Sequence, residues 1–276
     1  MNIQLGRSKT VRRAYGIDEI ALVPGNRTVD PEATSTKWEI GGIERDIPII
    51  ASAMDGVVNV EMAASLSNLG ALGVLNLEGV QTRYLNPIPI LEEISSVDNE
   101  SFVPLMQKVY SQPIKEELIK KRISEIKSKG GIAAVSATPI AAMRYQKIIT
   151  EAGADIFFIQ ATVVSTEHIG LEGKESLDLE RFCKEIDIPV AIGNCVTYEV
   201  AIKLMKAGAS AVMVGIGPGA ACTSRGVLGV GIPQATAISD CSAARNDYQK
   251  ETGKYIPIIA DGGIITGGDI CKCIAC

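Results

Sequence analysis

Residues 206–217 read KAGASAVMVGIG, and residues 151–161 read EAGADIFFIQA. Each stretch joins the end of an amphipathic segment to a short apolar run through an Ala-Gly-Ala turn. A glycine at a helix C-terminus can adopt the left-handed conformation that ends the helix and directs the chain into the next strand. Because the same device occurs twice, we expect one strand and helix unit to be repeated along the chain.

Seven short apolar runs fit this unit. They lie at 47–54, 71–76, 131–137, 154–161, 188–194, 210–217 and 256–263. They show little of the alternation of a half-exposed strand, which indicates parallel strands covered on both faces. Amphipathic segments separate them. This order leaves a doubly wound open sheet or an eight-fold barrel, and the number of strands favours an α/β fold of the TIM (β/α)8 barrel type.

The eighth strand of such a barrel is missing, because the sequence ends with a predicted helix at 267–276. A barrel without one strand has two unpaired edges and an open core. We therefore expect residues 1–276 to be a single barrel domain that is incomplete at its C-terminus, inactive alone and active in the complete protein. Residues 77–130 predict two crossover helices with a loop, and no second domain.

The composition is that of an ordinary globular protein, with 46% hydrophobic and 21% charged residues. A net charge of −5 provides no basic surface for nucleic acid. The sequence shows no signal peptide, and no apolar run reaches the roughly 20 residues that cross a bilayer. Seven cysteines, an odd number, suit reduced thiols. We expect a cytoplasmic protein that binds neither nucleic acid nor membrane.

In a parallel barrel the active site is built from the loops that follow the strands. These loops are 52–56, 160–162, 193–195, 215–226 and 261–268. The fourth reads GIGPGAACTSRG and resembles a dinucleotide fingerprint. Pro218 and an Ala-Cys-Thr-Ser run separate its glycines from any helix, which excludes that interpretation.

Cys222 in the same loop is a candidate nucleophile. An isolated cysteine is usually a buried small hydrophobe, but a glycine-rich loop after a barrel strand would display this one at the mouth. Local dipoles or partners that favour the thiolate would make it reactive. The single histidine, His168, allows a Cys–His pair, although no spacing signal indicates one.

The stretch ADGGI at 260–264 predicts a phosphosugar site. The carboxylate of Asp261 suits a pair of sugar hydroxyls. The N–H groups of Gly262 and Gly263 can approach an anion without a Cβ in the way. The alternative is a plain turn followed by a helix cap.

Together these motifs resemble the IMP dehydrogenase and GMP reductase family. The likeness runs through YGIDEIALVPG (15–25), IPIIASAMDGV (47–57), GNCVT (193–197), GIGPGAACTSRGVLGVGIPQ (215–234) and IPIIADGGIITGGDI (256–270). No pair of CBS modules is inserted between the second and third strands. The chain is therefore most similar to an IMP dehydrogenase-related branch without these modules.

The resemblance implies a reaction and a set of residues. Cys222 would attack C2 of the purine of IMP, NAD+ would take a hydride, and water would release XMP. The implied substrate contacts are Thr223 beside the purine, Ser52 and Met54 lining the nucleotide pocket, Asp261 on the ribose, and Ala220, Gly262 and Gly263 at the phosphate. The implied nicotinamide region comprises Gln160, Ala161, Thr162, Asn194, Gly215, Ile216 and Gly217, with Asn194 close to the purine. The carbonyls of Gly217, Gly219 and Cys222 would hold a monovalent cation such as K+.

Two positions depart from the family pattern. Family dehydrogenases usually have Asp-Ser-Ser where this chain has Gln160, Ala161 and Thr162, and a phosphate-binding serine is replaced by Ala220, which leaves only its N–H. GMP reductase, which converts GMP to IMP with NADPH, is the alternative activity, and a non-catalytic nucleotide-binding fragment is another. The family also implies a homotetramer.

Overall fold

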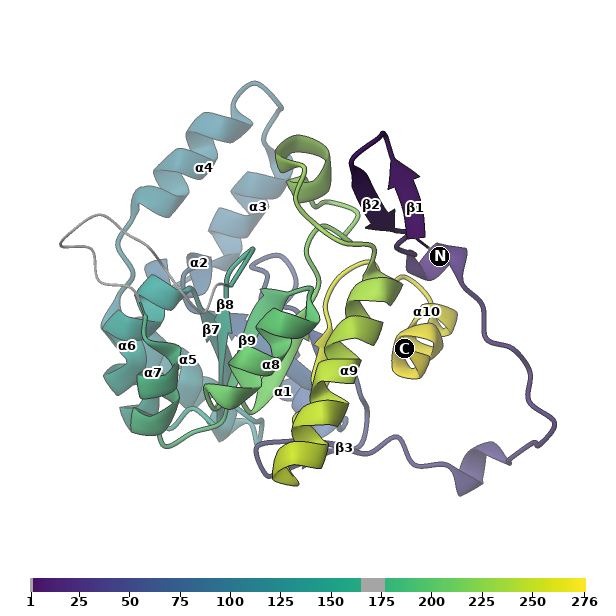
Figure 1. Ribbon diagram of the computed structural model, residues 1–276. Coiled ribbons are helices and arrows are strands. Elements are labelled where there is room, and N and C mark those ends of the chain that lie inside the picture. Colours follow the sequence, from purple (N-terminus) through teal and green to yellow (C-terminus); the bar gives the residue numbers. More distant parts are fainter. Residues whose placement is uncertain (1, 165–176) are drawn as a thin grey trace.

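The computed structural model describes residues 2–164 and 177–276, and its centre is a seven-stranded parallel sheet (Figure 1). The strands are β5 (Ile50–Ala51), β6 (Leu72–Asn76), β7 (Ala134–Ala137), β8 (Ile156–Gln160), β9 (Val190–Cys195), β10 (Ala211–Val214) and β11 (Ile258–Ala260). Each pairs in parallel with the next strand along the chain, so β5 and β11 form the two edges. The seven predicted strands are confirmed.

The sheet curls, and both of its faces are buried. On the concave side, Val74, Phe158 and Met213 pack in one apolar cluster that residues from both edge strands, Ile50 and Ile259, also join. Alternate residues pack against the helices instead, and the buried strand members of that cluster are Leu75, Val135, Ala137, Phe157, Ile159, Val190, Ile192, Cys195, Val212 and Val214. Burial on both sides explains why the strands read as continuous apolar runs. The fold is TIM-barrel-like, without an eighth strand among the residues that the structure describes.

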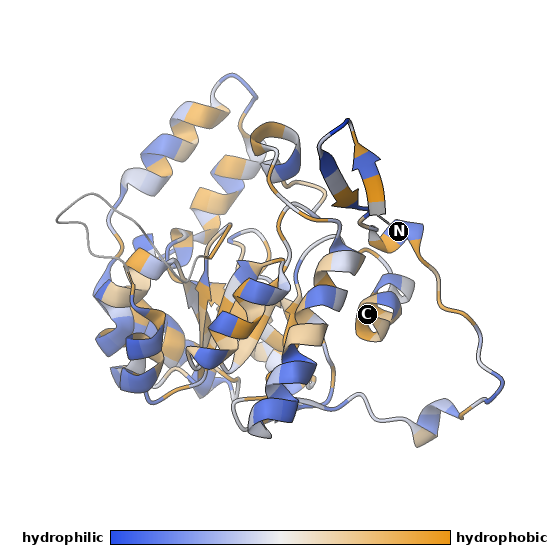
Figure 2. Ribbon diagram, in the orientation of Figure 1, coloured by the Kyte–Doolittle hydropathy of each residue, from blue (hydrophilic) through white to orange (hydrophobic). Residues whose placement is uncertain are grey.

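Helices cover the outer face of the sheet and turn their polar sides to solvent (Figure 2). They are α1 (Val60–Asn68), α5 (Glu116–Ser128), α6 (Pro139–Glu151), α7 (Leu179–Glu185), α8 (Tyr198–Lys206), α9 (Gln234–Thr252) and α10 (Gly267–Ala275). The two Ala-Gly-Ala turns behave as predicted, because Gly153 and Gly208 have φ angles of 78° and 103°. Threonine caps open the helices that precede them, with Thr138 at α6 and Thr197 at α8.

The prediction of two helices between the second and third strands was wrong. This segment contains four helices: α2 (Val80–Arg83), α3 (Ile88–Ser96), α4 (Phe102–Ser111) and α5. The first three have a small core of their own, in which Val80, Leu105 and Val109 are buried, whereas Ile119, Ile123 and Ile126 of α5 belong to the main core. The buried Arg122 of α5 donates hydrogen bonds to the carbonyls of residue 81 in α2 and of residues 84 and 85 directly after it. Contacts within the segment therefore stabilise short helices whose sequence shows little periodicity.

Two antiparallel hairpins were not anticipated, and each attaches part of the N-terminal segment to the barrel, whereas residues 21–37 between them are exposed and extend away from it (Figure 1). Strands β1 (Asn2–Leu5) and β2 (Lys9–Arg12) pair beside α9, where Arg12 forms an ion pair with Asp240. Strands β3 (Trp38–Ile40) and β4 (Ile43–Arg45) pair at the end of the sheet where the strands begin, with Ile40 fully buried in the concave cluster. No helix among residues 2–164 and 177–276 is long and apolar enough to cross a membrane. The opposite end of the sheet holds the loops predicted to form the site.

Candidate active site

A cavity of about 500 Å³ lies at the carboxyl ends of the strands. Of the residues predicted from sequence, it is lined by Gln160, Ala161, Thr162, Asn194, Gly215, Ile216, Gly217, Gly219, Cys222, Asp261 and Gly262. Its walls also include residues that sequence reasoning missed, among them Asn76, Glu78, Ser136, Thr138 and Ser224. This volume is within the range of pockets that bind small molecules. Together with Ala53 after β5, residues at the ends of all seven strands thus meet around one space.

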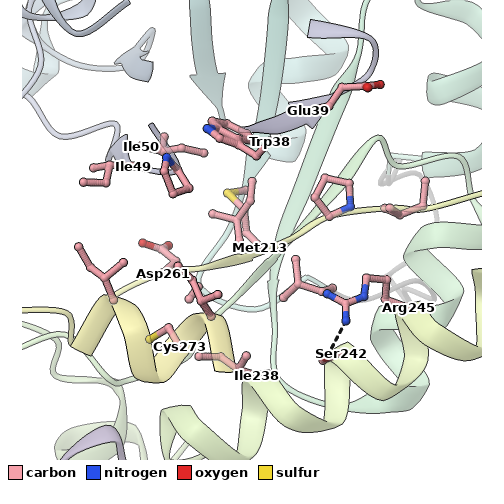
Figure 3. A pocket seen from close by; sticks show the side chains of 18 of the residues that line it. Trp38, Glu39, Ile49, Ile50, Met213, Ile238, Ser242, Arg245, Asp261 and Cys273 are labelled. Carbon is pink, nitrogen blue, oxygen red and sulfur yellow. Dashed lines mark hydrogen bonds between the residues drawn. The ribbon is translucent and has the colours of Figure 1, made fainter. Parts of the chain in front are cut away.

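The other predicted residues lie outside this cavity. Ser52 and Gly263 line a larger cavity of about 1830 Å³, which reaches the concave apolar cluster beside Trp38 and Met213 (Figure 3). Met54, Ala220 and Thr223 are exposed and line neither cavity. The two cavities share four lining residues, which are Ala53, Gln160, Asp261 and Gly262. These four residues separate the smaller cavity, at the carboxyl ends of the strands, from the larger cavity inside the curled sheet.

The loop that carries Cys222 is held in shape by close backbone packing. A Cβ on Gly217 would lie 2.3 Å from the Arg225 side chain, and one on Gly231 would lie 2.6 Å from it. The backbone at residues 217 and 231 therefore packs directly against the Arg225 side chain. The N–H of Cys222 donates to the carbonyl of Gly219 over 3.0 Å. A single π-helical turn, Ser224–Leu228, follows. Glycine is required at 217 because its φ of 82° is also unfavourable for other residues.

The Cys222 side chain is exposed, and its surroundings favour the thiolate. Its Sγ lies 3.4 Å from Ser224 Oγ. The Ser224 hydroxyl, the N–H of Ser224 and then the N–H of Gly217 lower the pKa of the Cys222 thiol. In contrast, burial raises the pKa of Cys183 to about 11 and that of Cys273 to about 11. His168 lies outside the described residues, so the structure does not address a Cys–His pair.

The carboxylate of Asp261 is held by two side-chain amides. Asn194 Nδ2 donates to Asp261 Oδ2 over 2.7 Å and to the Gly215 carbonyl over 2.8 Å. Gln160 Nε2 donates to the same Oδ2 over 3.2 Å. These contacts join residues that are 67 and 101 positions apart in sequence. The ends of β8, β9 and β11 are thereby connected at one oxygen atom, and Asn194 links the end of β10 to them through the Gly215 carbonyl.

Gln234 fixes the backbone behind this carboxylate, and sequence reasoning missed it. Its Nε2 donates to the Val214 carbonyl over 2.8 Å and to the Asp261 carbonyl over 3.3 Å. The side chain is buried at the first residue of α9. The available signal for Gln234 was its position: it is a polar residue directly after Pro233, at the start of a helix that faces the strand ends. A Cβ on Gly215 would lie 2.0 Å from the Asp261 carbonyl, which explains the glycine there.

The loop after β11 packs against the cysteine loop. Gly262 and Gly263 have φ angles of 90° and 76°. A Cβ on Gly263 would lie 2.9 Å from the Pro218 carbonyl, so only glycine allows this approach. The cap of α10 lies further on, at Thr266 and Asp269. The alternative of a turn with a helix cap therefore describes residues 266–269, whereas Asp261 and Gly262 face the cavity.

A second acid in these loops, Asp55, is enclosed by protein donors. Its Oδ1 accepts from Asn76 Nδ2 over 3.2 Å, and its Oδ2 accepts from the Val80 N–H over 3.0 Å and the Tyr110 hydroxyl over 2.6 Å. A Cβ on Gly79 would lie 1.7 Å from Oδ1. Burial, followed by the hydrogen bond to Asp55, raises the pKa of Tyr110. Asp55 thus attaches the loop after β5 to α2 and α4.

Comparison with known proteins places this geometry in context. Residues 14–276 match the model of the IMP dehydrogenase / GMP reductase domain. The chain is 38% identical over 281 residues to an uncharacterized oxidoreductase of Mycobacterium tuberculosis, which covers 99% of this chain and 75% of that protein. It is 32% identical to the inosine-5'-monophosphate dehydrogenase of Cryptosporidium parvum, over 97% of this chain and 66% of that protein.

A solved structure also matches. The crystal structure of an IMP dehydrogenase/GMP reductase-like protein from Corynebacterium glutamicum superimposes with a TM-score of 0.90 at 32% identity, covering 100% of this chain and 73% of that one. Sequence and fold therefore agree over the whole region that carries the cavity.

Proposed function

We propose, from the premise that this chain belongs to the IMP dehydrogenase / GMP reductase family, that it carries the site for oxidation of IMP to XMP with NAD+. The observation that most supports this is the meeting of two groups at one cavity. The thiol of Cys222, whose pKa is lowered, lies on one loop, and the carboxylate of Asp261 lies on the loop packed against it.

In the proposed reaction, the Cys222 thiolate adds to C2 of the purine. The hydride that leaves C2 passes to NAD+, and a thioimidate between sulfur and C2 remains. Water then adds to C2, and the C–S bond breaks to release XMP and the thiol. The balance is IMP, NAD+ and water giving XMP, NADH and a proton. A thiol is suited to this role because the thiolate is both a good nucleophile and a good leaving group.

The nucleotide would lie with its ribose against Asp261. Two vicinal hydroxyls can donate to one carboxylate, and the N–H groups at Gly262 and Gly263 suit an anionic phosphate nearby. Ala220 contributes only its N–H to such an anion. NAD+ supplies a hydride acceptor, and Ala161, Thr162 and the 215–217 backbone would border its nicotinamide. Gly215 and Gly217 line the cavity there with backbone atoms.

A monovalent cation fits the cysteine loop by its donor chemistry. Carbonyl oxygens are hard ligands of the kind that such cations take, and Gly217, Gly219 and Cys222 would supply them. The turn in which Cys222 N–H donates to Gly219 O brings these residues into one bend of the chain. The cation would hold that bend, and thereby the sulfur, in place.

The test is an assay of the full-length protein with IMP and NAD+, in which NADH absorbance is followed, beside a parallel assay with GMP and NADPH. We expect NADH formation that Cys222→Ser abolishes. NADPH consumption with GMP, and no reaction with IMP, would reassign the site to GMP reduction by the same cysteine. Turnover that persists in Cys222→Ser would contradict the proposed mechanism.

A further inference from the structure

Gln160 and Asp261 are joined across the concave end of the sheet, although their strands are not neighbours. Gln160 is the last residue of β8 and Asp261 follows β11, with β9 and β10 between them. Their hydrogen bond, Nε2 to Oδ2 at 3.2 Å, lies on the boundary between the two cavities. It is therefore a contact of the site rather than of the strand ladder.

The two amides around Asp261 have only one sensible orientation. Asn194 faces two acceptors, the Gly215 carbonyl and the Asp261 carboxylate, so its NH2 group must point at both. The same reasoning turns the NH2 group of Gln160 toward the carboxylate. Both amides donate to Oδ2. Among the described residues, no hydrogen bond to Oδ1 of Asp261 is present, and the side chain is partly exposed.

We propose that Gln160 is a positioning residue for the ribose of the bound nucleotide, a proposal that rests on the function proposed above. By donating to Oδ2, Gln160 fixes the plane of the carboxylate and leaves Oδ1 to accept from the ribose hydroxyls. An aspartate at position 160, as in Asp-Ser-Ser, would place a second negative charge beside Asp261. Glutamine supplies a donor instead, so in this chain residue 160 acts through Asp261.

A purely structural role predicts a different result. The same hydrogen bond could simply attach β11, an edge strand with β10 as its ladder partner, to the rest of the sheet. Loss of such an attachment would lower the melting temperature and weaken all ligands alike. Loss of a positioning contact would weaken only ligands that carry the ribose hydroxyls. Discrimination between IMP and 2′,3′-dideoxy-IMP therefore separates the two roles.

The experiment measures Kd for both nucleotides by titration calorimetry, with the melting temperature of each protein. The variants are Gln160→Met, which keeps the length and removes the donor, and Gln160→Glu, which adds a charge. Gln249→Met, at an exposed position on α9, is the matched control. We expect Gln160→Met to bind IMP about tenfold more weakly and dideoxy-IMP unchanged. Gln160→Glu should lose more IMP affinity, and Gln249→Met should match the unmodified protein.

Two results would overturn the proposal: equal weakening of both nucleotides by Gln160→Met, or no change in either. If the unmodified protein binds neither nucleotide, the proposed function is wrong; if it binds both equally well, the ribose assignment of Asp261 is wrong, and the NADH assay decides the proposed function. Both outcomes are read from the unmodified protein alone, so they are distinguishable from a failure of Gln160.

Discussion

Asp55 and Asp261 are two aspartates that follow the two edge strands of one sheet, and they have opposite surroundings. Asp55, after β5, accepts from protein donors at both oxygens: Asn76 at one, and Val80 and Tyr110 at the other. Asp261, after β11, receives both of its side-chain donors at Oδ2. Position at the end of a barrel strand is therefore not enough to identify a ligand-binding acid. The number of donors that already occupy each oxygen distinguishes the closed carboxylate from the open one.

The largest expected effect on stability is at Asp55, the carboxylate whose oxygens are both occupied by protein donors. Asp55→Ala leaves the Tyr110 hydroxyl, the Val80 N–H and the Asn76 amide without their acceptor. We expect a loss of about 3 kcal/mol in the free energy of unfolding, measured by urea denaturation, because unpaired partly buried donors cost about 1–3 kcal/mol each. The Kd for IMP should change less than about twofold, since Asp55 does not line the cavity. An Asp55→Ala protein that is as stable as the unmodified protein but does not bind IMP would show that Asp55, and not Asp261, is the ligand-binding acid.

The next effect is on nucleotide binding at Asp261, the carboxylate with one oxygen that accepts from no protein donor. Asp261→Asn keeps the shape of the side chain and an oxygen that Asn194 can donate to, but it removes the charge that the ribose hydroxyls meet. We expect IMP binding to weaken about 100-fold, because hydrogen bonds to a charged group are worth about 1.5–3 kcal/mol each. The free energy of unfolding should fall by about 2 kcal/mol, because the hydrogen bonds from Asn194 and Gln160 change from charge-assisted to neutral ones. Calorimetric titration with IMP checks the first value, and unaltered affinity would contradict it.

A smaller effect sharpens the contrast at the closed carboxylate. Tyr110→Phe removes one of the donors to Asp55 and should cost about 1 kcal/mol of unfolding free energy, with IMP binding unchanged. The folded state raises the pKa of Tyr110 above its ordinary 10.0. The contribution of the Tyr110–Asp55 hydrogen bond to the free energy of unfolding is therefore complete below pH 10, and it is lost as the pH rises above that value. Urea denaturation of both proteins from pH 8 to pH 11 should show their stabilities converging at the alkaline end.

The smallest effect concerns the thiol on the open side. Because the pKa of Cys222 is lowered and that of Cys183 is raised to about 11, iodoacetamide should modify Cys222 several-fold faster at pH 7.5, as followed by peptide mass spectrometry. The rate at Cys222 should level off at a lower pH than for an ordinary thiol. Ser224→Ala removes the nearest donor and should move that plateau to higher pH. Identical profiles for the two cysteines would contradict the described surroundings of Cys222.

The core of the fold was predictable because a strand covered on both faces must be apolar throughout. Runs such as 154–161 and 188–194 meet that condition. In addition, an Ala-Gly-Ala turn marks the point where a helix ends and a strand begins before β8 and before β10. The N-terminal hairpins escaped prediction because they are short. Strand β2 is exposed along its whole length, so no alternation of polar and apolar residues reveals it. The helices α2 to α4 pack on one another in a core of their own, and Arg122 of α5 holds α2, neither of which a local sequence pattern records.

The site was predictable where the backbone needs a particular residue. Glycines at 215, 217, 262 and 263 are required by close approach or positive φ, and they direct attention to Cys222 and Asp261 between them. The amide contacts of Gln160 and Asn194 were not predictable, because each joins strand ends far apart in sequence. Their orientation depends on the curl of the sheet and on the register of four strands, which a local pattern does not encode.

The most direct test is whether one bound nucleotide reaches both the thiol and the open carboxylate. The measurement is the rate at which iodoacetamide modifies Cys222 as IMP is added, with the exposed Cys271 of α10 as the internal control in the same sample. The account predicts saturable protection of Cys222 at the IMP concentration that fills the Asp261 site, no protection of Cys271, and loss of protection in Asp261→Asn. Unchanged modification of Cys222 at saturating, calorimetrically verified IMP would contradict it.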